Sequence, residues 1–296
     1  ALEQGDVATG AEFTVIKEKA AVLVADGNWG FGQTQSQRLM ARLIEKGKSA
    51  GTASGTLVHC SHAGRLGEYC ETAAAAGLLS MVMVNTHGHA RRVAPPGGKR
   101  PRLGTNPLAM GVPADDGVLL LDVGTSATAE GKVRVKKFAG EQCPDGWILD
   151  SDGKPTNDPN DLYADPPGTI LPMGGPQAYK GFGLALMVEV FTGALSGGVC
   201  IRETPINQNG NCVFMQVWDP EDFGGADHFA AEVKGLAAFV RGCPRIDGVE
   251  EILLPGDPER RALAKRSAEG VPFDEGNWNQ LVELAQELKA AVPATR

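Results

Sequence analysis

The sequence predicts an α+β protein in which strands and helices form mixed layers. Three observations lead to this fold class. Short apolar runs alternate with helical patterns between residues 20 and 84, Asp115-Asp116-Gly117 is a strong hairpin signal, and a long apolar helix is predicted at Phe182–Leu195. The 296 residues are enough to bury one large core or two smaller ones.

The first third of the chain alternates strand and helix. Short β-prone runs between turn residues predict strands, and apolar residues from Leu39 to Ile44 recur with helical spacing. The segment before Ala20 is interpreted as a polar leading segment. The predicted order is then a strand at Ala20–Ala25, a turn at Asp26-Gly27-Asn28, a helix at Gln33–Gly47, a strand at Thr52–Val58, a helix at Glu68–Ala76 and a strand at Leu78–Val84.

A long loop rich in His, Arg, Pro and Gly follows at Asn85–Gly104, and loops of this length in compact domains are usually functional or disordered. The remaining predictions are strands at Leu108–Pro113 and Val118–Val123, a helix within Thr125–Phe138, a loop at Pro144–Pro167, the helix Phe182–Leu195 ended by Gly197-Gly198, a strand at Cys212–Val217, a helix at Ala226–Arg241, a strand at Glu251–Leu254, and helices at Glu259–Ala268 and Asn277–Ala291.

Composition restricts the class of partner. The formal net charge is −8 and basic residues are spread along the chain, which argues against nucleic acid or an anionic membrane as the main partner. No apolar run reaches the roughly 18 residues of a membrane span, and no signal peptide is visible. The six cysteines form no CxxC pair, so we expect reduced, isolated thiols and a cytoplasmic location.

The stretch Leu57–Tyr69 carries the most concentrated chemistry. A β-prone run ends in His59, Cys60, Ser61 and His62, and glycines then lead into an Ala-rich helix. Helix N-termini favour anions, and an imidazole there titrates near neutral pH. A plain strand end followed by a polar turn explains the same residues, so both interpretations stay open at this point.

Other local signals are weaker. His87-x-His89 could supply two metal ligands, but no third ligand is suggested and we expect no metal. Ser61-His62 is poor evidence for a nucleophile and its base, because such groups are assembled in space rather than side by side in sequence. Lys180, at a helix start, is placed either to meet a phosphate or carboxylate or to lie in solvent. No GxGxxG follows the first strand, so a Rossmann site is not indicated.

Longer motifs occur in a fixed order along nearly the whole chain: Asp26-Gly27-x-x-Gly30-Phe31-Gly32-Gln33, Ser61-His62-x-Gly64-Arg65-x-Gly67-x-Tyr69, Arg92-Val93-Ala94-Pro95-Pro96-Gly97-Gly98, Leu103-Gly104-Thr105-Asn106-Pro107, Asp122-x-x-Thr125-Ser126, Glu130-Gly131-Lys132, Pro144-x-Gly146-Trp147, Leu171-Pro172-x-Gly174-Gly175, Lys180-Gly181-x-Gly183-Leu184 and Pro255-Gly256. In this order they resemble the malate/L-lactate/L-sulfolactate/ureidoglycolate dehydrogenase family. That family binds NAD(P) without a Rossmann fold and includes reductases of cyclic imino acids such as Δ1-piperideine-2-carboxylate.

The resemblance implies a non-Rossmann fold with a largely antiparallel or mixed sheet flanked by helices, working as a homodimer. It implies hydride transfer between NAD or NADP and C2 of a 2-hydroxy or 2-oxo acid of the malate or lactate type. His62 matches the family histidine at the reaction centre, where it would act as general base or acid. Thr105 matches a substrate contact. Family cofactor contacts fall on His62, Ala63, Gly64, Arg65, Leu66, Asp122, Val123, Gly124, Lys180, Pro255, Gly256, Asp257, Pro258, Glu259 and Arg260.

The same resemblance predicts a cofactor-binding core at residues 13–242, with residues 1–12 and 243–296 in a second, mainly helical lobe. Family members usually carry a further helical segment with an Asp-Ser-His-Gly motif ahead of the point that matches Ala1, and we expect it to be missing here. Residues 176–179 also depart from the usual Gly-Gly-His-Lys-Gly pattern. Three functions stay open: a 2-hydroxy-acid dehydrogenase, a cyclic-imine reductase, or a cofactor-binding subunit without catalysis.

Overall fold

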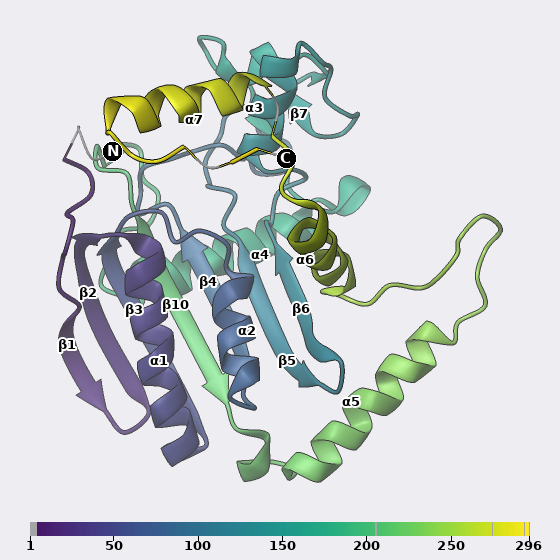
Figure 1. Cartoon of the computed structure of the whole chain (residues 1–296). Helices are drawn as coiled ribbons and strands as arrows, with labels where there is room; N and C mark the ends of the chain where they lie inside the picture. The colour runs from purple at the N-terminus through teal and green to yellow at the C-terminus, as the bar shows by residue number, and fades with distance from the viewer. Residues whose placement is uncertain (1–4, 205, 274, 293, 296) are drawn as a thin grey trace. The chain divides into compact units, whose positions relative to one another are not determined.

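A seven-stranded mixed sheet organises the larger of two units (Figure 1). The computed structural model describes residues 5–204, 206–273, 275–292 and 294–295. The chain divides into the units Ala1–Ala238 and Phe239–Arg296. The strand order is β1-β2-β3-β10-β4-β5-β6, with β2 and β3 parallel and every other neighbouring pair antiparallel. The predicted mixed, largely antiparallel sheet is therefore confirmed.

The predicted strands of the sheet are all present, with ends that differ from the prediction by at most five residues. The first strand alone was not predicted, because all six of its side chains are exposed and it shows no apolar alternation. The strands are β1 (Thr14–Lys19), β2 (Val22–Gly30), β3 (Thr52–Cys60), β4 (Leu79–Asn85), β5 (Leu108–Ala114), β6 (Gly117–Val123) and β10 (Asn211–Trp218).

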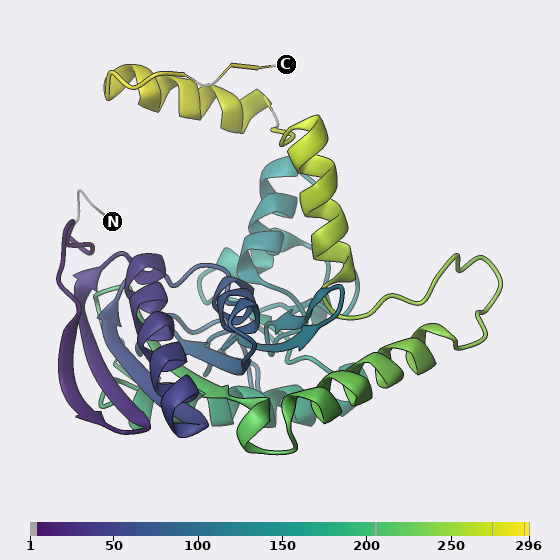
Figure 2. The same cartoon turned by 60° about the horizontal axis from the view of Figure 1, so that its bottom comes forward.

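Helices cover both faces of this sheet (Figures 1 and 2). On one face lie α1 (Gly32–Ala50) and α2 (Gly67–Ala75). Glycine in β3 permits close packing there, since a Cβ on Gly55 would lie 2.8 Å from Leu39 Cδ1. On the other face, α4 (Tyr179–Glu189) and the π-helical turn η3 (Val190–Ala194) pack against Met83, Leu108 and Phe214.

A smaller layer within the same unit has its own buried cluster, which includes Val93, Leu103, Val133 and Ile170. The predicted loop at Pro144–Pro167 is partly wrong, because this segment contributes two short strands and a 3₁₀ turn to that layer. Its elements are α3 (Glu130–Ala139), β7 (Ile148–Leu149), β8 (Pro155–Thr156), η1 (Pro159–Tyr163), β9 (Thr169–Ile170) and η2 (Gly175–Gln177).

After η4 (Pro220–Asp222), α5 (Ala226–Arg241) leads into the second unit, which contains α6 (Asp257–Glu269) and α7 (Glu275–Glu287). The predicted strand at Glu251–Leu254 is wrong, because this run has irregular backbone and no partner strand in the described part of the chain. Instead, the Asp257 carboxylate accepts the Leu254 N–H at 2.8 Å and closes a turn before α6.

The assignment of residues 1–12 and 243–296 to one helical lobe stays a prediction, and Ala1–Gln4 lie outside the described residues. Within the described ranges, no helix is both long and apolar enough to cross a lipid bilayer.

Candidate active site

The site is built at one edge of the sheet. Because β2 and β3 run parallel and β10 runs antiparallel to β3 and β4, the carboxyl ends of β2, β3 and β4 meet the amino end of β10. The motif Leu57–Tyr69 leaves the sheet at this edge. Its polar residues therefore lie beside side chains from three other strands.

A histidine pair occupies this edge. His59 Nδ1 lies 2.8 Å from Asp26 Oδ2, so the carboxylate accepts the ring proton and fixes the imidazole. The His59 ring centroid is 5.4 Å from that of His87, and the Trp29 ring lies 5.2 Å from His59 and 5.3 Å from His87. The sequence placed two imidazoles at the end of β3, but it did not predict that Asp26 would orient one of them.

The backbone here differs from the prediction at Asp26-Gly27-Asn28. These residues belong to β2 rather than to a turn, and a bulge shifts the β2–β3 register between Asp26 and Gly30. Asn28 and Trp29 adopt φ angles of 47° and 58°, and the Asn28 N–H bonds Asp26 Oδ1 at 2.7 Å. The bulge aims Trp29 at the histidines, a known use of bulges beside functional sites.

His87 is buried and neutral. Burial lowers its pKa, and the charges of His59 and Arg202 lower it further. Its Nδ1 lies 3.0 Å from Cys212 Sγ, and burial raises the pKa of that thiol to about 11. The protonated thiol therefore donates to a neutral ring. The other histidine of the pair considered for a metal, His89, bonds the Ile206 carbonyl oxygen at 2.7 Å.

The described residues contain no group of three metal-ligating side chains. Ser61 has a structural contact, because its buried hydroxyl oxygen accepts the Gly32 N–H at 2.9 Å at the start of α1.

The turn between β3 and α2 holds the predicted catalytic residue. His62 is exposed, while its neighbour Ala63 is buried and donates its N–H to Asn211 Oδ1 at 2.8 Å. Gly64 adopts a φ of 74°, which L side chains rarely adopt. The turn therefore presents the His62 imidazole to solvent from a backbone that β10 holds in place.

Asp122 joins β6 to this turn. Its Oδ2 accepts the Gly67 N–H at 2.7 Å, at the N-terminus of α2. Leu66, within this turn, is buried in the core. Arg65 makes a bidentate pair with Glu71 at 2.8 and 2.9 Å, which balances its charge. The structure thus brings two groups of predicted cofactor contacts together, around Leu66 and around Asp122.

Thr105 is connected to the same region. The Thr105 carbonyl oxygen accepts both the N–H and the hydroxyl of Thr125, at 3.0 and 2.9 Å, next to the exposed Gly124. A Cβ on Gly181 would lie 2.9 Å from the Thr125 carbonyl oxygen, so the first turn of α4 packs against this backbone. Lys180 precedes Gly181 and is exposed. The predicted substrate contact thus lies beside two of the predicted cofactor segments.

A buried carboxylate, which the sequence analysis missed, holds this arrangement. Glu189, at the end of α4, accepts Asn85 Nδ2 at 3.0 Å, Asn106 Nδ2 at 2.7 Å and the Ile201 N–H at 2.6 Å. It ties the end of β4 to the residue after Thr105. The available signal was a glutamate directly after the apolar run Leu184–Val188, since charged residues are almost never fully buried unless paired.

The remaining predicted contacts, Pro255–Arg260, lie in the second unit. Asp257 is buried at the start of α6. Burial would raise the pKa of its carboxyl, but the Leu254 N–H and the charges of Arg241 and Arg260 outweigh this effect and lower it. Pro255, Pro258 and Glu259 are exposed at the same turn.

Comparisons with known proteins agree with this architecture. The sequence model of the family described as Malate/L-lactate dehydrogenase matches residues 1–282. An L-lactate dehydrogenase of Cupriavidus necator is 36% identical over 284 residues, which are 94% of this chain and 80% of that protein.

Two solved structures show the same fold. The malate dehydrogenase of Entamoeba histolytica superposes with a TM-score of 0.90 at 25% identity, over 99% of this chain and 84% of that one. The Δ1-piperideine-2-carboxylate reductase of Pseudomonas syringae superposes with a TM-score of 0.80 at 31% identity, over 96% and 83%. By the family match and the sequence identity together, this chain belongs to the malate/L-lactate dehydrogenase family.

Proposed function

We propose that this chain is an NAD(P)-dependent oxidoreductase that transfers a hydride between a nicotinamide and C2 of a 2-hydroxy or 2-oxo acid of the malate or lactate type. The observation that carries the proposal is the exposed imidazole of His62, presented by a rigid turn in a chain that belongs to a dehydrogenase family. A titratable imidazole is the side chain most often used for proton transfer at neutral pH.

His62 takes the proton of the C2 hydroxyl during oxidation and returns it during reduction. Thr105 contacts the substrate, and the hydrogen bonds from Thr125 hold its backbone in place. The Asp26–His59 pair and the neutral His87 line the sheet edge from which the His62 turn departs. We assign these three residues to shaping the polar surroundings, and the proton transfer to His62.

The residues fit an anionic dinucleotide, NAD or NADP, as the cofactor. When bound, it supplies or accepts the hydride. Lys180 is exposed and brings a positive charge to the start of α4, and Gly64 and Gly124 carry no side chain that would keep a ligand away from the backbone. Asp122 and the turn Pro255–Arg260 complete the proposed cofactor contacts.

A cyclic imino-acid reductase is the second candidate. The structural similarity to a Δ1-piperideine-2-carboxylate reductase favours it, and reduction of a C=N acid needs the same proton donor at His62. A subunit that binds the cofactor without catalysis is the third.

A panel of 2-oxo acids and cyclic imines, followed by oxidation of NADH and of NADPH, separates all three candidates. Turnover of an acid such as oxaloacetate or pyruvate supports the first. Turnover of cyclic imines alone supports the second. Binding of the cofactor without turnover supports the third and contradicts the proposed activity.

We also propose a homodimer in the cytoplasm. Six apolar side chains are exposed on α4, on η3 and just after it, and exposed apolar side chains gathered along one segment indicate an interaction surface. They are Leu184, Leu186, Met187, Val190, Phe191 and Leu195. The strand Cys212–Val217, in contrast, does not need a partner subunit, because β10 lies between β3 and β4.

Obligate dimer interfaces bury upwards of about 2,000 Å². Light scattering that returns a monomer at micromolar concentration would contradict the dimer. All six cysteines are free thiols, as a reducing compartment would keep them.

A further inference from the structure

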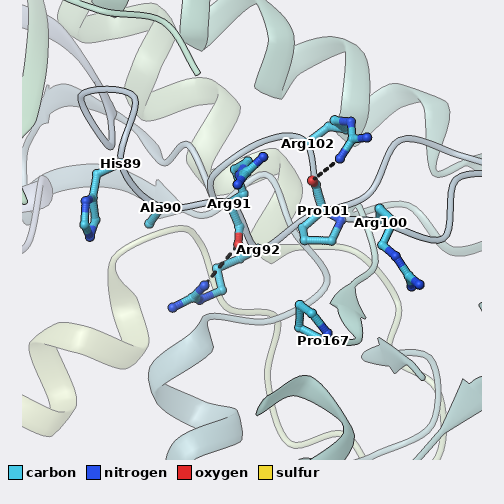
Figure 3. Close-up of a pocket in the computed structure, with 8 residues that line it drawn as sticks. All are labelled: His89, Ala90, Arg91, Arg92, Arg100, Pro101, Arg102 and Pro167. Carbon is cyan, nitrogen blue, oxygen red and sulfur yellow. Dashed lines mark hydrogen bonds between the residues drawn. The ribbon is translucent and has the colours of Figure 1, made fainter. Parts of the chain in front are cut away.

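A cavity of about 380 Å³ lies on the loop between β4 and β5, and four arginines line it (Figure 3). They are Arg91, Arg92, Arg100 and Arg102. His89 and Pro167 complete much of the wall. The volume falls in the range of small-molecule pockets, roughly 300–1,000 Å³.

The backbone that carries these arginines is held firmly. Two extended arms, residues 91–93 and 102–103, pair through the Arg92 N–H on the Leu103 carbonyl and the Arg102 N–H on the Val93 carbonyl, both at 2.8 Å. Val93 also bridges Ile170 of β9. Val93, Leu103 and Ile170 are buried in the core of the smaller layer. Arg91, Arg92 and Arg102 therefore project from two hydrogen-bonded arms.

Within the part of the chain that the structure describes, the hydrogen-bond partners of these guanidinium groups are backbone carbonyls. Arg91 donates to the Glu203 carbonyl at 3.3 Å, Arg92 to the Arg91 carbonyl at 3.1 Å, and Arg102 to the Pro101 carbonyl at 3.2 Å. Arg100 donates to the carbonyls of Lys99 and Ser151. Within the described ranges, none of the four forms an ion pair with a carboxylate.

The carboxylate of Glu130 interacts electrostatically with one of these arginines, Arg92. Burial would raise the pKa of Glu130, but hydrogen bonds from Arg134 and Tyr163 and the charges of Arg134 and Arg92 lower it instead. Arg92 is thus partly balanced.

The clustering is unusual for this chain. Acidic residues outnumber basic ones by 36 to 28, and arginines elsewhere, such as Arg42, Arg134 and Arg261, pair with a carboxylate. Arginine stays charged at every ordinary pH. Four such charges around one cavity repel one another, and an anionic ligand would relieve this repulsion.

We propose that this arginine pocket binds a small polyanion that carries two or more phosphate groups. Guanidinium forks match phosphate oxygens in a bidentate manner. The four groups point in different directions around Pro101 rather than toward one centre (Figure 3). A single monoanion would reach only part of them, whereas linked phosphates can contact several. Two sources supply this chemistry: the phosphates of the dinucleotide, or a separate phosphorylated metabolite.

The pocket is connected to the candidate active site through one turn. The His89 N–H donates to the Thr86 carbonyl at 2.9 Å, and the Thr86 hydroxyl donates to the Ala90 carbonyl at 3.1 Å. The same turn holds His87 against Trp29 and His59. Because the pocket is only one turn away from the candidate active site, its position is compatible with either source of phosphate. Competition with the cofactor therefore has to identify the source.

Isothermal titration calorimetry of the full chain with sodium pyrophosphate tests the pocket, with sodium chloride at matched ionic strength as the blank. We expect saturable pyrophosphate binding that weakens as salt is added. Arg91→Gln/Arg102→Gln should raise the dissociation constant at least tenfold. The matched control is Arg38→Gln, an exposed arginine on α1 that also donates to a backbone carbonyl, and it should leave binding unchanged.

The single variant Arg100→Gln gives a second test if the double variant unfolds, as urea titration would reveal. Repeating the titration with saturating NADH or NADPH identifies the source. Competition assigns the pocket to the phosphates of the dinucleotide, and unchanged binding assigns it to a separate phosphorylated metabolite.

No pyrophosphate heat above the chloride blank, or equal binding by wild type and the arginine variants, would overturn the proposal. The readout does not use turnover, so its failure differs from failure of the proposed dehydrogenase activity.

Discussion

Replacing Gly181 by alanine tests how closely α4 packs on the substrate loop. A Cβ at Gly181 would lie 2.3 and 2.7 Å from the backbone O and N of Met173, and 2.9 Å from the Thr125 carbonyl oxygen. These are backbone atoms, so relief requires the start of α4 to move. Overpacking of this kind costs up to about 3 kcal/mol, and the better helix propensity of alanine returns about 1 kcal/mol. We expect Gly181→Ala to lower the free energy of unfolding by about 2 kcal/mol.

Gly183→Ala is the matched control. It is the same substitution two residues later in α4, where a Cβ would meet no atom within 4 Å. Only the propensity term then remains, so the free energy of unfolding should rise by about 0.5–1 kcal/mol. Urea unfolding followed by circular dichroism measures both variants.

A shift of the start of α4 should also weaken cofactor binding, because Lys180 and Thr125 flank the contact at Gly181. Binding of NAD(P)H, measured by nicotinamide fluorescence, should weaken in Gly181→Ala and stay unchanged in Gly183→Ala. Two variants of equal stability would refute the close packing of α4 on Thr125.

Three further predictions concern single residues. Burial lowers the pKa of His87 below its ordinary value near 6.5, so the neutral imidazole stabilises the fold fully above that pH and loses this effect as the pH falls below it. His87→Gln should therefore flatten the dependence of the unfolding free energy on pH below 6.5. An unchanged pH profile in urea unfolding would contradict this prediction. Glu189→Gln replaces one carboxylate oxygen with a donor that faces another donor, and should cost about 3 kcal/mol in urea unfolding; a loss below about 0.5 kcal/mol would mean that the network contributes little. Lys180→Met should weaken NAD(P)H binding by about 1–3 kcal/mol, and by less for a cofactor fragment without phosphates, whereas equal dissociation constants would leave Lys180 an ordinary surface residue.

Local signals predicted most of the sheet and its helices. Periodicity and turn residues located α1, α2, β4 and the β5–β6 hairpin to within a few residues. The strand prediction for Glu251–Leu254 was wrong, because β-prone residues form a strand only where a neighbouring strand pairs with them. The prediction of a turn in place of the β2 bulge was wrong for a related reason. Asp26-Gly27-Asn28 favours a turn locally, yet pairing with β3 resumes at Gly30.

The sequence could predict the candidate site only where its residues lie in one continuous segment. The turn Ser61–Gly67 is continuous in sequence, and His62 could be singled out. The Asp26–His59 pair required knowing that β2 and β3 are parallel neighbours. Glu189 required knowing that α4 crosses the end of β4, where Asn85 and Asn106 meet its carboxylate. These long-range contacts are made by the fold, and no local pattern encodes them.

The kcat of His62→Ala tests the central claim most directly. With the best 2-oxo acid and cofactor from the substrate panel, we expect a loss of at least about a hundredfold, the usual contribution of a general acid or base. The dissociation constant for NAD(P)H should change little. His228→Ala, which removes an imidazole from α5, should keep the wild-type kcat. A His62→Ala enzyme whose kcat equals that of the wild type would remove His62 from the proton transfer and contradict the proposed mechanism.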